Sequence, residues 1–413
     1  MTRTSRSGRT ARRTHGFTES VIREMTRVAA ETGAINLAQG FPDFAAPDVL
    51  KEAACAAIRA DVNQYAVTWG SPRLRRALAR KYADSYGMEV DESREVTVTC
   101  GATEAMAAAL LATVDPEDEI LIFEPFYENY GPDAVLCGAR AVWVPLDPSA
   151  PIDLDRLEAA VTPRTRGLIL NSPNNPTGRT LRRAELEAIA ELCGRHDLLA
   201  FTDEIYEHII YDGEHIPLAS LPGMRERTIT ISGYSKTFSI TGWRIGTIVA
   251  PASLTGAIRK VHDFLTVGAP APLQDACAAA LETLDAEYYT ALTREYRERR
   301  DVLYAGLVDA GFRCTRPEGA YYILADFSEL SPLDDIAYAR ALATGGGPGT
   351  DGPGGVATVP GSSFFHDPGL GRRFVRFAFC KRLPTLREAA DRLRRIARIP
   401  DPNQEPCVPA SFD

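Results

Sequence analysis

Short apolar runs rich in β-branched residues alternate with segments of helical periodicity through the middle of the chain. Segments such as 104–113 and 183–196 carry apolar residues at helical spacing and separate several of the apolar runs. Strands that are apolar along their whole length and joined by helices are typical of a mostly parallel sheet. The pattern therefore predicts an α/β fold with a seven-stranded, mostly parallel sheet covered by helices on both faces. The seven predicted strands lie at residues 96–99, 120–123, 141–144, 168–170, 198–202, 229–231 and 247–249.

The segments outside this alternation predict a second, smaller α+β domain. Residues 20–30 have helical periodicity that ends near Gly33, and residues 287–308 predict a long charged helix that bridges two domains. Short apolar runs and a predicted helix at 385–397 complete the small domain. The predicted organisation is a disordered leader at 1–14, an N-terminal segment of the small domain at 15–48, a large domain at 49–290, the C-terminal small domain at 291–399 and a flexible tail at 400–413.

Composition and charge narrow the classes of partner. The 413 residues are 45% hydrophobic and 24% charged, which is ordinary for a globular protein with a large core. The formal net charge is −9. An acidic chain is poorly suited to broad binding of nucleic acid or acidic membrane. We therefore expect a small-molecule ligand.

The eight cysteines are scattered, with no CxxC pair and no His/Cys cluster. This spacing predicts neither a metal site nor a disulfide framework, and reduced thiols favour a cytoplasmic protein. Residues 1–14 are rich in Arg, Ser and Thr and lack the apolar core of a secretory signal. Their composition also resembles an organellar transit peptide, although a short disordered leader is the simpler interpretation.

One glycine-rich stretch, at 345–355, contains a match to the GxGxxG pattern at 347–352. The match follows a helical segment instead of a strand, and a proline stands where a backbone amide would be needed to bind phosphate. We interpret the stretch as a mobile linker.

Chemically unusual residues follow the predicted strands, and ligands of parallel sheets bind at the carboxyl ends of strands. Gly101, Ala102 and Thr103 open a helix, whose N-terminus favours an anion. Asp203 and Tyr206 follow the fifth strand. Each feature has a structural explanation as well, since Asp at a strand end is often a helix cap.

Lys236 follows the sixth predicted strand in a stretch of small and hydroxyl residues, and Arg244 stands eight residues later. Most lysines are solvated surface groups. This lysine, however, is flanked by groups suited to an anion, a pattern that fits an amine held beside a phosphorylated ligand.

The stretch 232–246 resembles the Schiff-base lysine segment of fold type I pyridoxal-phosphate aminotransferases, with its Lys-x-Phe-x-x-x-Gly-Trp-Arg-x-Gly pattern. The stretch 171–178 is similar to the family's Asn-x-Pro-x-Asn-Pro-x-Gly. The resemblance implies that Lys236 binds the cofactor, pyridoxal 5′-phosphate, covalently and that Arg244 binds its phosphate. Gly233 replaces a phosphate-binding serine of the family, so Ser232 and Ser235 are both candidates for that role.

The resemblance extends to the remaining cofactor contacts. It implies that Asp203 binds the pyridine nitrogen, that Asn175 and Tyr206 bind the phenolic oxygen and that Tyr127 stacks on the ring. Gly101, Ala102 and Thr103 would contact the phosphate. A carboxylate at the ring nitrogen holds that nitrogen protonated, which lets the ring accept electrons.

Substrate contacts and a dimer are implied in the same way. Arg376 lies in an apolar strand, where an unpaired charge is costly; the family's arginine at this motif binds the substrate α-carboxylate, and a structural ion pair is the alternative. Gly40 and Asn175 would also meet that carboxylate, although Gly40 also suits a simple turn. Tyr65 is similar to a tyrosine that reaches the partner's cofactor phosphate, which implies a homodimer.

The nearest subgroup is the kynurenine, glutamine and methionine aminotransferases, on the segments 39–43, 63–65 and 221–224. The expected reaction is ping-pong transfer of an amino group from an L-amino acid to a 2-keto acid. Residues 267–272 contain no arginine and Ile22 replaces a tryptophan of the subgroup, so we expect neutral or aromatic substrates. The alternatives are an aspartate-type aminotransferase, a β-lyase or other chemistry of the same cofactor, and a non-catalytic ligand sensor.

Overall fold

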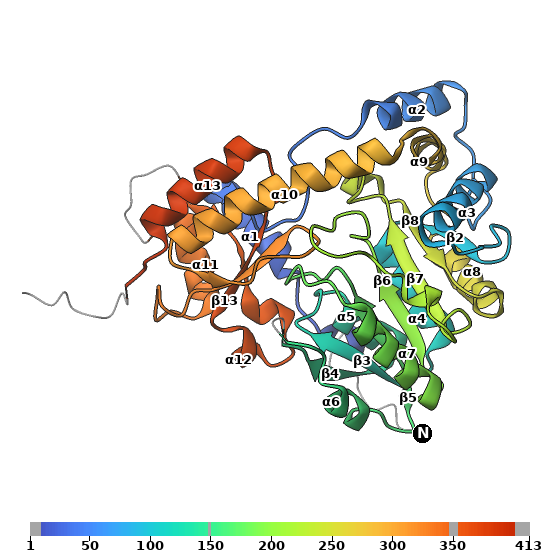
Figure 1. The fold of residues 1–413 in the computed structure, drawn as a ribbon, viewed down its shortest axis with the longest axis horizontal. Helices are drawn as coiled ribbons and strands as arrows, with labels where there is room; N and C mark the ends of the chain where they lie inside the picture. Colours follow the sequence, from blue (N-terminus) through green and yellow to red (C-terminus); the bar gives the residue numbers. More distant parts are fainter. Residues whose placement is uncertain (1–9, 148–149, 347–353, 401–413) are drawn as a thin grey trace, which may run out of the picture. The chain divides into compact units, whose positions relative to one another are not determined.

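The structure is a computed structural model that describes residues 10–147, 150–346 and 354–400. It contains two compact units (Figure 1). The large unit comprises the residues up to Glu19 together with Phe41–Arg297 and Pro317–Ala320. The small unit comprises Ser20–Gly40, Glu298–Arg316 and the residues from Tyr321 on.

A seven-stranded sheet forms the centre of the large unit, in the order β2-β8-β7-β6-β5-β3-β4. Strand β8 is antiparallel to both of its neighbours, and the other pairs are parallel. The α/β prediction of a seven-stranded, mostly parallel sheet is therefore confirmed. The strands are β2 (Val96–Thr99), β3 (Glu119–Glu124), β4 (Arg140–Pro145), β5 (Thr165–Asn171), β6 (Leu199–Asp203), β7 (Thr228–Gly233) and β8 (Gly246–Val249).

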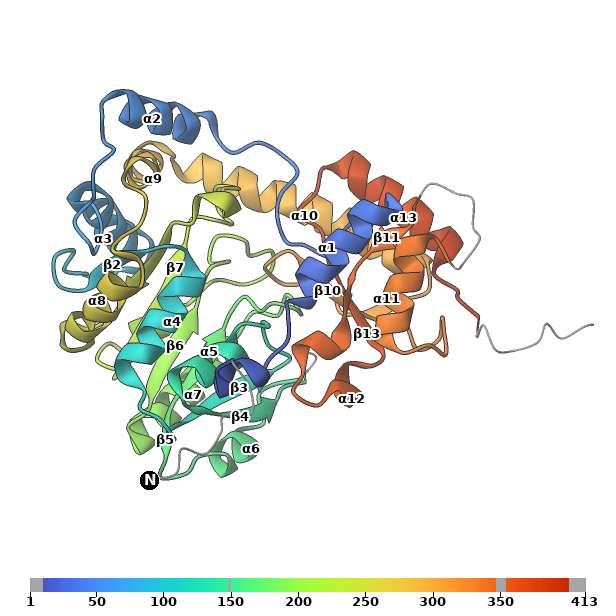
Figure 2. The same ribbon diagram turned by 180° about the vertical axis from the view of Figure 1, so that it is seen from behind.

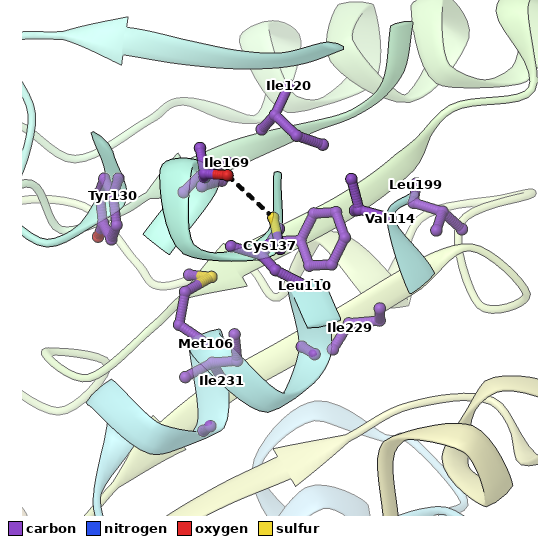
Figure 3. Packing of buried hydrophobic residues seen from close by; sticks show 14 of the residues in the cluster. Met106, Leu110, Val114, Ile120, Tyr130, Cys137, Ile169, Leu199, Ile229 and Ile231 are labelled. Carbon is purple, nitrogen blue, oxygen red and sulfur yellow. Dashed lines mark hydrogen bonds between the residues drawn. The ribbon is translucent and has the colours of Figure 1, made fainter. Parts of the chain in front are cut away.

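Both faces of this sheet are covered by helices. Alternate side chains of each strand point to opposite faces, so each strand contributes to two buried layers. On one face Ile120, Ile169 and Ile229 pack with α4 (Ala102–Thr113), and α4 crosses in front of the sheet in Figure 2. Figure 3 shows Met106 and Leu110 of α4 together with Ile231 in this cluster of buried side chains. On the opposite face Leu121 and Leu168 pack with α7 (Arg183–His196).

Further helices pack around this core. Helix α3 (Pro72–Tyr86) has Ser71 as its N-cap and proline at its first position. Gly87 ends α3 in the left-handed conformation that glycine adopts readily. The other large-unit helices are α2 (Asp48–Arg59), α5 (Tyr130–Cys137), α6 (Leu154–Ala159), α8 (Ala252–Thr266) and α9 (Ala271–Thr283), with short 3-10 turns η1 (Arg12–His15), η2 (Leu218–Ser220) and η3 (Thr241–Trp243).

The small unit combines helices with a four-stranded antiparallel sheet in the order β12-β13-β10-β9. Its first helix, α1 (Val21–Thr32), is capped by Ser20 and ends at Gly33, as the sequence predicts. The sheet strands are β9 (Arg313–Cys314), β10 (Tyr322–Asp326), β12 (Val359–Pro360) and β13 (Phe374–Ala378). The remaining elements are the pair β1 (Ile35–Asn36) and β11 (Val356–Ala357), the helices α11 (Asp335–Thr344), α12 (Pro368–Gly371) and α13 (Leu383–Ile396), and the turn η4 (Gly361–Phe364).

Helix α10 (Ala286–Asp309) is the long helix that the sequence predicts, and it starts in the large unit and ends in the small one. Most of the predicted glycine-rich linker, most of the leader and nearly all of the tail, at 347–353, 1–9 and 401–413, lie outside the described residues. Within the described residues no helix is both long and apolar enough to cross a membrane.

Candidate active site

Asp203 is the last residue of β6 and is 8% exposed. Its Oδ2 accepts a hydrogen bond of 2.7 Å from the hydroxyl of Tyr130, and its Oδ1 lies 3.4 Å from the backbone nitrogen of Ile205. Burial raises the pKa of Asp203, while the hydrogen bond from Tyr130 acts in the opposite direction. The carboxylate therefore stands at a strand end in a place where a cation would stabilise its charged form.

The Asn/Pro turn follows β5, the strand beside β6, so it reaches the same edge of the sheet. Asn171 donates its side-chain amide to the carbonyl oxygen of Asp203 at 2.9 Å. The side-chain oxygen of Asn171 accepts the backbone N–H of Asn175 at 2.8 Å. These two bonds fix Asn175, which is 4% exposed, next to the end of β6.

Lys236 follows β7, which pairs with β6 in parallel, so the structure brings this lysine to the strand end that carries Asp203 and Tyr206. Its Nζ lies 5.8 Å from the ring centroid of Tyr206, and Tyr206 is 3% exposed. The lysine is only partly exposed. A buried carboxylate, a phenol and an amine thus come from two adjacent strands.

Gly101 is the N-cap of α4 and makes a close approach to Arg244. Its φ is +85°, and a Cβ at this position would lie 2.3 Å from Arg244 Nη2. A Cβ at Gly246 would lie 2.6 Å from the backbone nitrogen of Ala102. Glycine is needed at both positions because the guanidinium and the start of α4 share this space. The arrangement places a cation beside the N-terminal amides of a helix, which is a suitable environment for phosphate.

The other predicted cofactor contacts lie at the same edge of the sheet. Ala102 and Thr103 are the first two residues of α4, and Thr103 is exposed. Tyr127 lies between β3 and α5 with its ring 5.7 Å from that of Tyr130. Ser235 is buried beside Lys236.

The structure separates the two serine candidates for the phosphate. Ser232 donates its hydroxyl to Glu207 Oε1 at 2.7 Å and is 3% exposed. Since the Ser232 hydroxyl points to a carboxylate, Ser235 is the better candidate of the two.

In the small unit Arg376 is 1% exposed in the middle of β13. Its Nη2 donates to the carbonyl oxygen of Ala38 at 2.5 Å, and its guanidinium lies 4.3 Å from the ring centroid of Tyr322 and 5.0 Å from that of Phe364. The contacts to a carbonyl and two aromatic faces hold the guanidinium plane in a fixed orientation.

Gly40 is also in the small unit, and the structure gives a physical reason for the glycine. A Cβ there would lie 2.0 Å from the hydroxyl of Tyr322. The carbonyl oxygen of Gly40 accepts the hydroxyl of Tyr321 at 2.9 Å. Two tyrosines therefore pack against the backbone at this point, and neither contact is evident from the sequence.

Tyr65 lies in the loop between α2 and α3 and is 88% exposed. Among the predicted site residues of the large unit, Thr103 and Arg244 are exposed as well. Within the part of the chain that the structure describes, no group of three or more His, Cys, Asp or Glu side chains is arranged to hold a metal ion.

A family model described as aminotransferase class I and II matches residues 32–393. The chain belongs to this family.

Two relatives and one solved structure illustrate the similarity. A probable N-succinyldiaminopimelate aminotransferase from Mycobacterium tuberculosis is 44% identical over 95% of this chain and 99% of its own length. The methionine aminotransferase of Escherichia coli is 36% identical over 91% of this chain and 96% of its own. The solved structure of N-succinyldiaminopimelate aminotransferase from M. tuberculosis has a TM-score of 0.88, with 44% identity, and covers 93% of this chain and 99% of that one.

These findings confirm several predictions from the sequence. The chain is an aminotransferase of fold type I that uses pyridoxal 5′-phosphate to transfer amino groups, near the kynurenine and methionine subgroup. Its relatives act as aminotransferases on amino acids and keto acids, and the side-chain specificity is not fixed by family membership.

The residues of this aminotransferase suit the cofactor on independent grounds. Asp203 is a buried carboxylate whose pKa is raised by burial, so a protonated ring nitrogen would compensate for its desolvation. The glycines at 101 and 246 leave room that a Cβ would fill, next to Arg244 and the start of α4. A protonated ring nitrogen would pair with the buried Asp203 carboxylate, and a phosphate would occupy the space beside Arg244 and the start of α4.

The sequence analysis missed Tyr130 and Asp133 as members of the site. Both lie on α5, three residues apart and therefore on one face of the helix. Tyr130 binds Asp203, and Asp133 is 6% exposed with an Oδ2 that has no hydrogen-bond partner. The closeness of Tyr130 to Tyr127 in sequence was the only signal available.

Burial, together with the charge of Asp203, raises the pKa of Asp133 to about 7. This pKa lies above the usual value of 3.8, so the folded protein keeps a proton that the unfolded chain loses as the pH rises from about 4 to 7. The free energy of unfolding therefore falls with pH in this window.

We expect Asp133→Asn to remove this fall of the free energy of unfolding with pH. The substitution should stabilise the cofactor-free protein by about 2–4 kcal/mol at pH 7 and by much less at pH 4. Urea unfolding of both proteins at the two pH values measures the difference. Asp155→Asn, at an exposed carboxylate in α6, is the control and should change stability little at either pH. An equal gain at both pH values would show that Asp133 is ionised when buried.

Proposed function

We propose that this aminotransferase moves the α-amino group of a neutral or aromatic L-amino acid to a 2-keto acid by a ping-pong mechanism. The observation that carries the proposal is the placement of Lys236, Tyr206 and Asp203 at the ends of two paired strands. The cofactor, when bound, supplies the electron sink for the carbanion that forms at the substrate Cα.

Each predicted site residue of the large unit except Tyr65 would help to hold that cofactor within its own chain. Lys236 binds it covalently through Nζ between reaction cycles, and Asp203 holds the ring nitrogen protonated with support from the Tyr130 hydroxyl. Tyr206 and Asn175 bind the phenolic oxygen, and Tyr127 stacks on the ring. Arg244 and Ser235, with the amides of Gly101, Ala102 and Thr103, bind the phosphate.

Lys236 also carries the catalytic proton. With the cofactor and a substrate bound, the ε-amine of Lys236 would remove the proton from the substrate Cα as a general base and would later give it back as a general acid. The ring of Tyr206, with its centroid 5.8 Å from Nζ, borders this amine on one side.

Arg376 binds the substrate α-carboxylate through a bidentate fork, with help from Asn175 and the backbone of Gly40. Support comes from the fixed orientation of the Arg376 guanidinium between the Ala38 carbonyl and two aromatic rings. A guanidinium held in one orientation loses little entropy when it binds a carboxylate.

The preference for neutral or aromatic side chains rests on the residues near the expected side-chain pocket. Residues 267–272 contain no arginine, and Ile22 is buried on α1. The E. coli relative is a methionine aminotransferase. Arg23 is exposed beside Ile22 and is the residue that would meet an acidic side chain.

The M. tuberculosis relatives support a second candidate substrate, N-succinyldiaminopimelate, because the identity of 44% extends over nearly the whole of both chains. This amino acid has a long side chain that ends in carboxylates. We assign Arg23 to the binding of these side-chain carboxylates.

We expect a panel of donors, scored by keto-acid release, to rank methionine, phenylalanine, kynurenine and glutamine above aspartate. Arg376→Ala should weaken every donor alike, by about 2–5 kcal/mol in kcat/KM, and leave the ranking unchanged. Strong activity with N-succinyldiaminopimelate that is lost in Arg23→Gln would establish the second candidate. Aspartate as the best donor would contradict the pocket assignment, and ammonia release without cofactor cycling would point to a β-lyase.

We also propose a cytoplasmic homodimer in which Tyr65 reaches the partner's phosphate site. An exposed apolar surface supports it: Tyr65 is 88% exposed and Phe264 92% exposed. The loop and the end of α8 adjoin each other, because His262 Nε2 lies 2.9 Å from the carbonyl oxygen of Thr68. Apolar side chains gathered at one place on a surface are typical of interfaces.

Mixing inactive Lys236→Ala with an inactive Tyr65→Ala variant should restore part of the activity, because one site of the hybrid dimer then has both residues. Sedimentation measures the dimer, and initial rates measure the complementation. Asp203→Asn mixed with Lys236→Ala is the control, since both residues follow paired strands of one chain and no site of the hybrid then has both. A fully active monomer would refute the proposal.

A further inference from the structure

A cavity of about 1060 Å³ lies in the large unit between α3 and the first half of α10. Its lining positions on each helix follow helical spacing, so one face of each helix forms a wall. We call this cavity the α3–α10 groove. On α10 the lining residues include Tyr289, Thr290, Thr293, Arg294 and Arg297.

None of the predicted cofactor-binding residues lines the groove, but Glu207 connects the groove to them. Glu207 lines the groove, is 7% exposed, and binds Lys81 and, at 2.6 Å, the Tyr86 hydroxyl through Oε2. Its Oε1 accepts the Ser232 hydroxyl at 2.7 Å. Ser232 lies on the strand that leads to Lys236, and Glu207 follows Tyr206 directly.

The charged side chains that line the groove balance in number, with the carboxylates Asp84, Glu207, Glu282 and Asp285 and the cations Arg80, Lys81, Arg294 and Arg297. Although burial acts to raise it, the Lys81 ammonium lowers the pKa of Glu207. Glu282 binds Arg73 at 2.7 Å and lies 3.5 Å from Arg80. Arg294 and Arg297 are therefore the cations of the groove that are not bound to its own carboxylates.

The arginines of α10 pair with exposed carboxylates. Arg294 Nη1 lies 3.8 Å from Glu287, and Arg297 Nη1 lies 3.9 Å from Asp212. Arg297 also donates through Nη2 to the carbonyl oxygen of Tyr211. All four side chains of the two ion pairs are about half or more exposed, and such pairs contribute little to stability. An anion with several oxygens can therefore compete with these carboxylates for the two guanidiniums, which lie about one helical turn apart.

Aromatic rings stand beside these cations. The rings of His208 and Tyr289 lie 4.6 Å apart, and Tyr86 and His215 form a second pair at 5.8 Å. Burial lowers the pKa of His208 to about 4, so this ring is neutral at pH 7. Neutral rings beside arginines suit a planar aromatic ligand that carries a negative charge.

The groove has room for a ligand larger than a free amino acid. Its volume of about 1060 Å³ lies just above the range of about 300–1,000 Å³ that is typical of pockets for drug-sized ligands. A nucleobase, a sugar and a phosphate together fit within this volume, with the base on the rings and the phosphate on the arginines.

We propose that the α3–α10 groove binds a nucleoside monophosphate and that its occupancy changes turnover through Glu207, Ser232 and the strand that leads to Lys236. This goes beyond amino-group transfer, because neither substrate nor cofactor of the proposed reaction is a nucleotide.

The test is calorimetric titration of the cofactor-loaded enzyme with AMP, UMP and adenosine. The bound cofactor blocks its own phosphate site, so that site cannot account for the signal. We expect binding of AMP or UMP, and binding of adenosine at least about tenfold weaker, because loss of charge-assisted hydrogen bonds costs this much or more. The double variant Arg294→Gln/Arg297→Gln should weaken the nucleotide by a similar factor.

Initial rates with the nucleotide provide the second measurement. Turnover should change on addition of nucleotide to the wild type and should not change in the double variant. Arg183→Gln is a matched control, since Arg183 is 57% exposed and 3.7 Å from Glu214 but outside the groove. No binding of either nucleotide at millimolar concentration, or equal binding by the double variant, would overturn the site. Binding with unchanged turnover would overturn the effector role.

Discussion

Replacing Lys236 with alanine is expected to lower kcat by at least about 10⁴-fold, the largest loss that we expect from a single substitution. The ε-amine both binds the cofactor and moves the Cα proton, and no second amine is placed to substitute for it in the proposed site. Steady-state keto-acid release measures the loss. Folding should be retained, because the side chain is partly exposed and lies after the end of β7.

Borohydride reduction of the wild type followed by peptide mapping locates the bound cofactor. The sequence contains five lysines, so the map distinguishes Lys236 from only four alternatives. Lys260→Ala, at an exposed lysine of α8, is the matched control and should leave turnover unchanged. A label on any lysine other than Lys236 would contradict the assignment.

Asp203→Asn is expected to lower kcat by about 10²–10³-fold, because an amide cannot stabilise a protonated ring nitrogen by charge. The side chain is nearly isosteric and still accepts the Tyr130 hydroxyl. Since burial raises the pKa of Asp203, removal of the charge should not destabilise the cofactor-free fold. Kinetics and urea unfolding together separate a catalytic effect from a structural one.

Tyr130→Phe provides the comparison for Asp203→Asn. It removes the hydrogen bond of 2.7 Å and leaves the carboxylate in place, so we expect a loss of about tenfold. Near-normal turnover in Asp203→Asn would show that this carboxylate serves only as a local cap for the Ile205 backbone.

Local periodicity determined most of the fold of this chain. The helix predicted at 183–196 has the observed bounds of α7, and each of the seven apolar runs overlaps a strand of the central sheet. Helices and strands place their apolar side chains at different spacings, so the two can be told apart from the sequence. Caps such as Ser20 and Ser71 bind backbone groups only a few residues away. The antiparallel direction of β8 was not predicted, because strand direction depends on distant chain connections.

Motifs in the sequence also named the proposed site residues, because Asp203 ends β6 and both Asn175 and Lys236 lie in the short segments that follow β5 and β7. The tertiary structure decided what surrounds them. Tyr130 reaches Asp203 from 73 positions away in sequence, and no local pattern encodes such a contact.

The reason for Gly40 and the choice between the two serines also came from the tertiary structure. Tyr322 fills the space beside Gly40, and Glu207 engages Ser232. The α3–α10 groove likewise joins residues that lie some 200 positions apart. Periodicity and short motifs depend on near neighbours, whereas burial, pKa and cavities depend on which distant side chains the folded chain brings together.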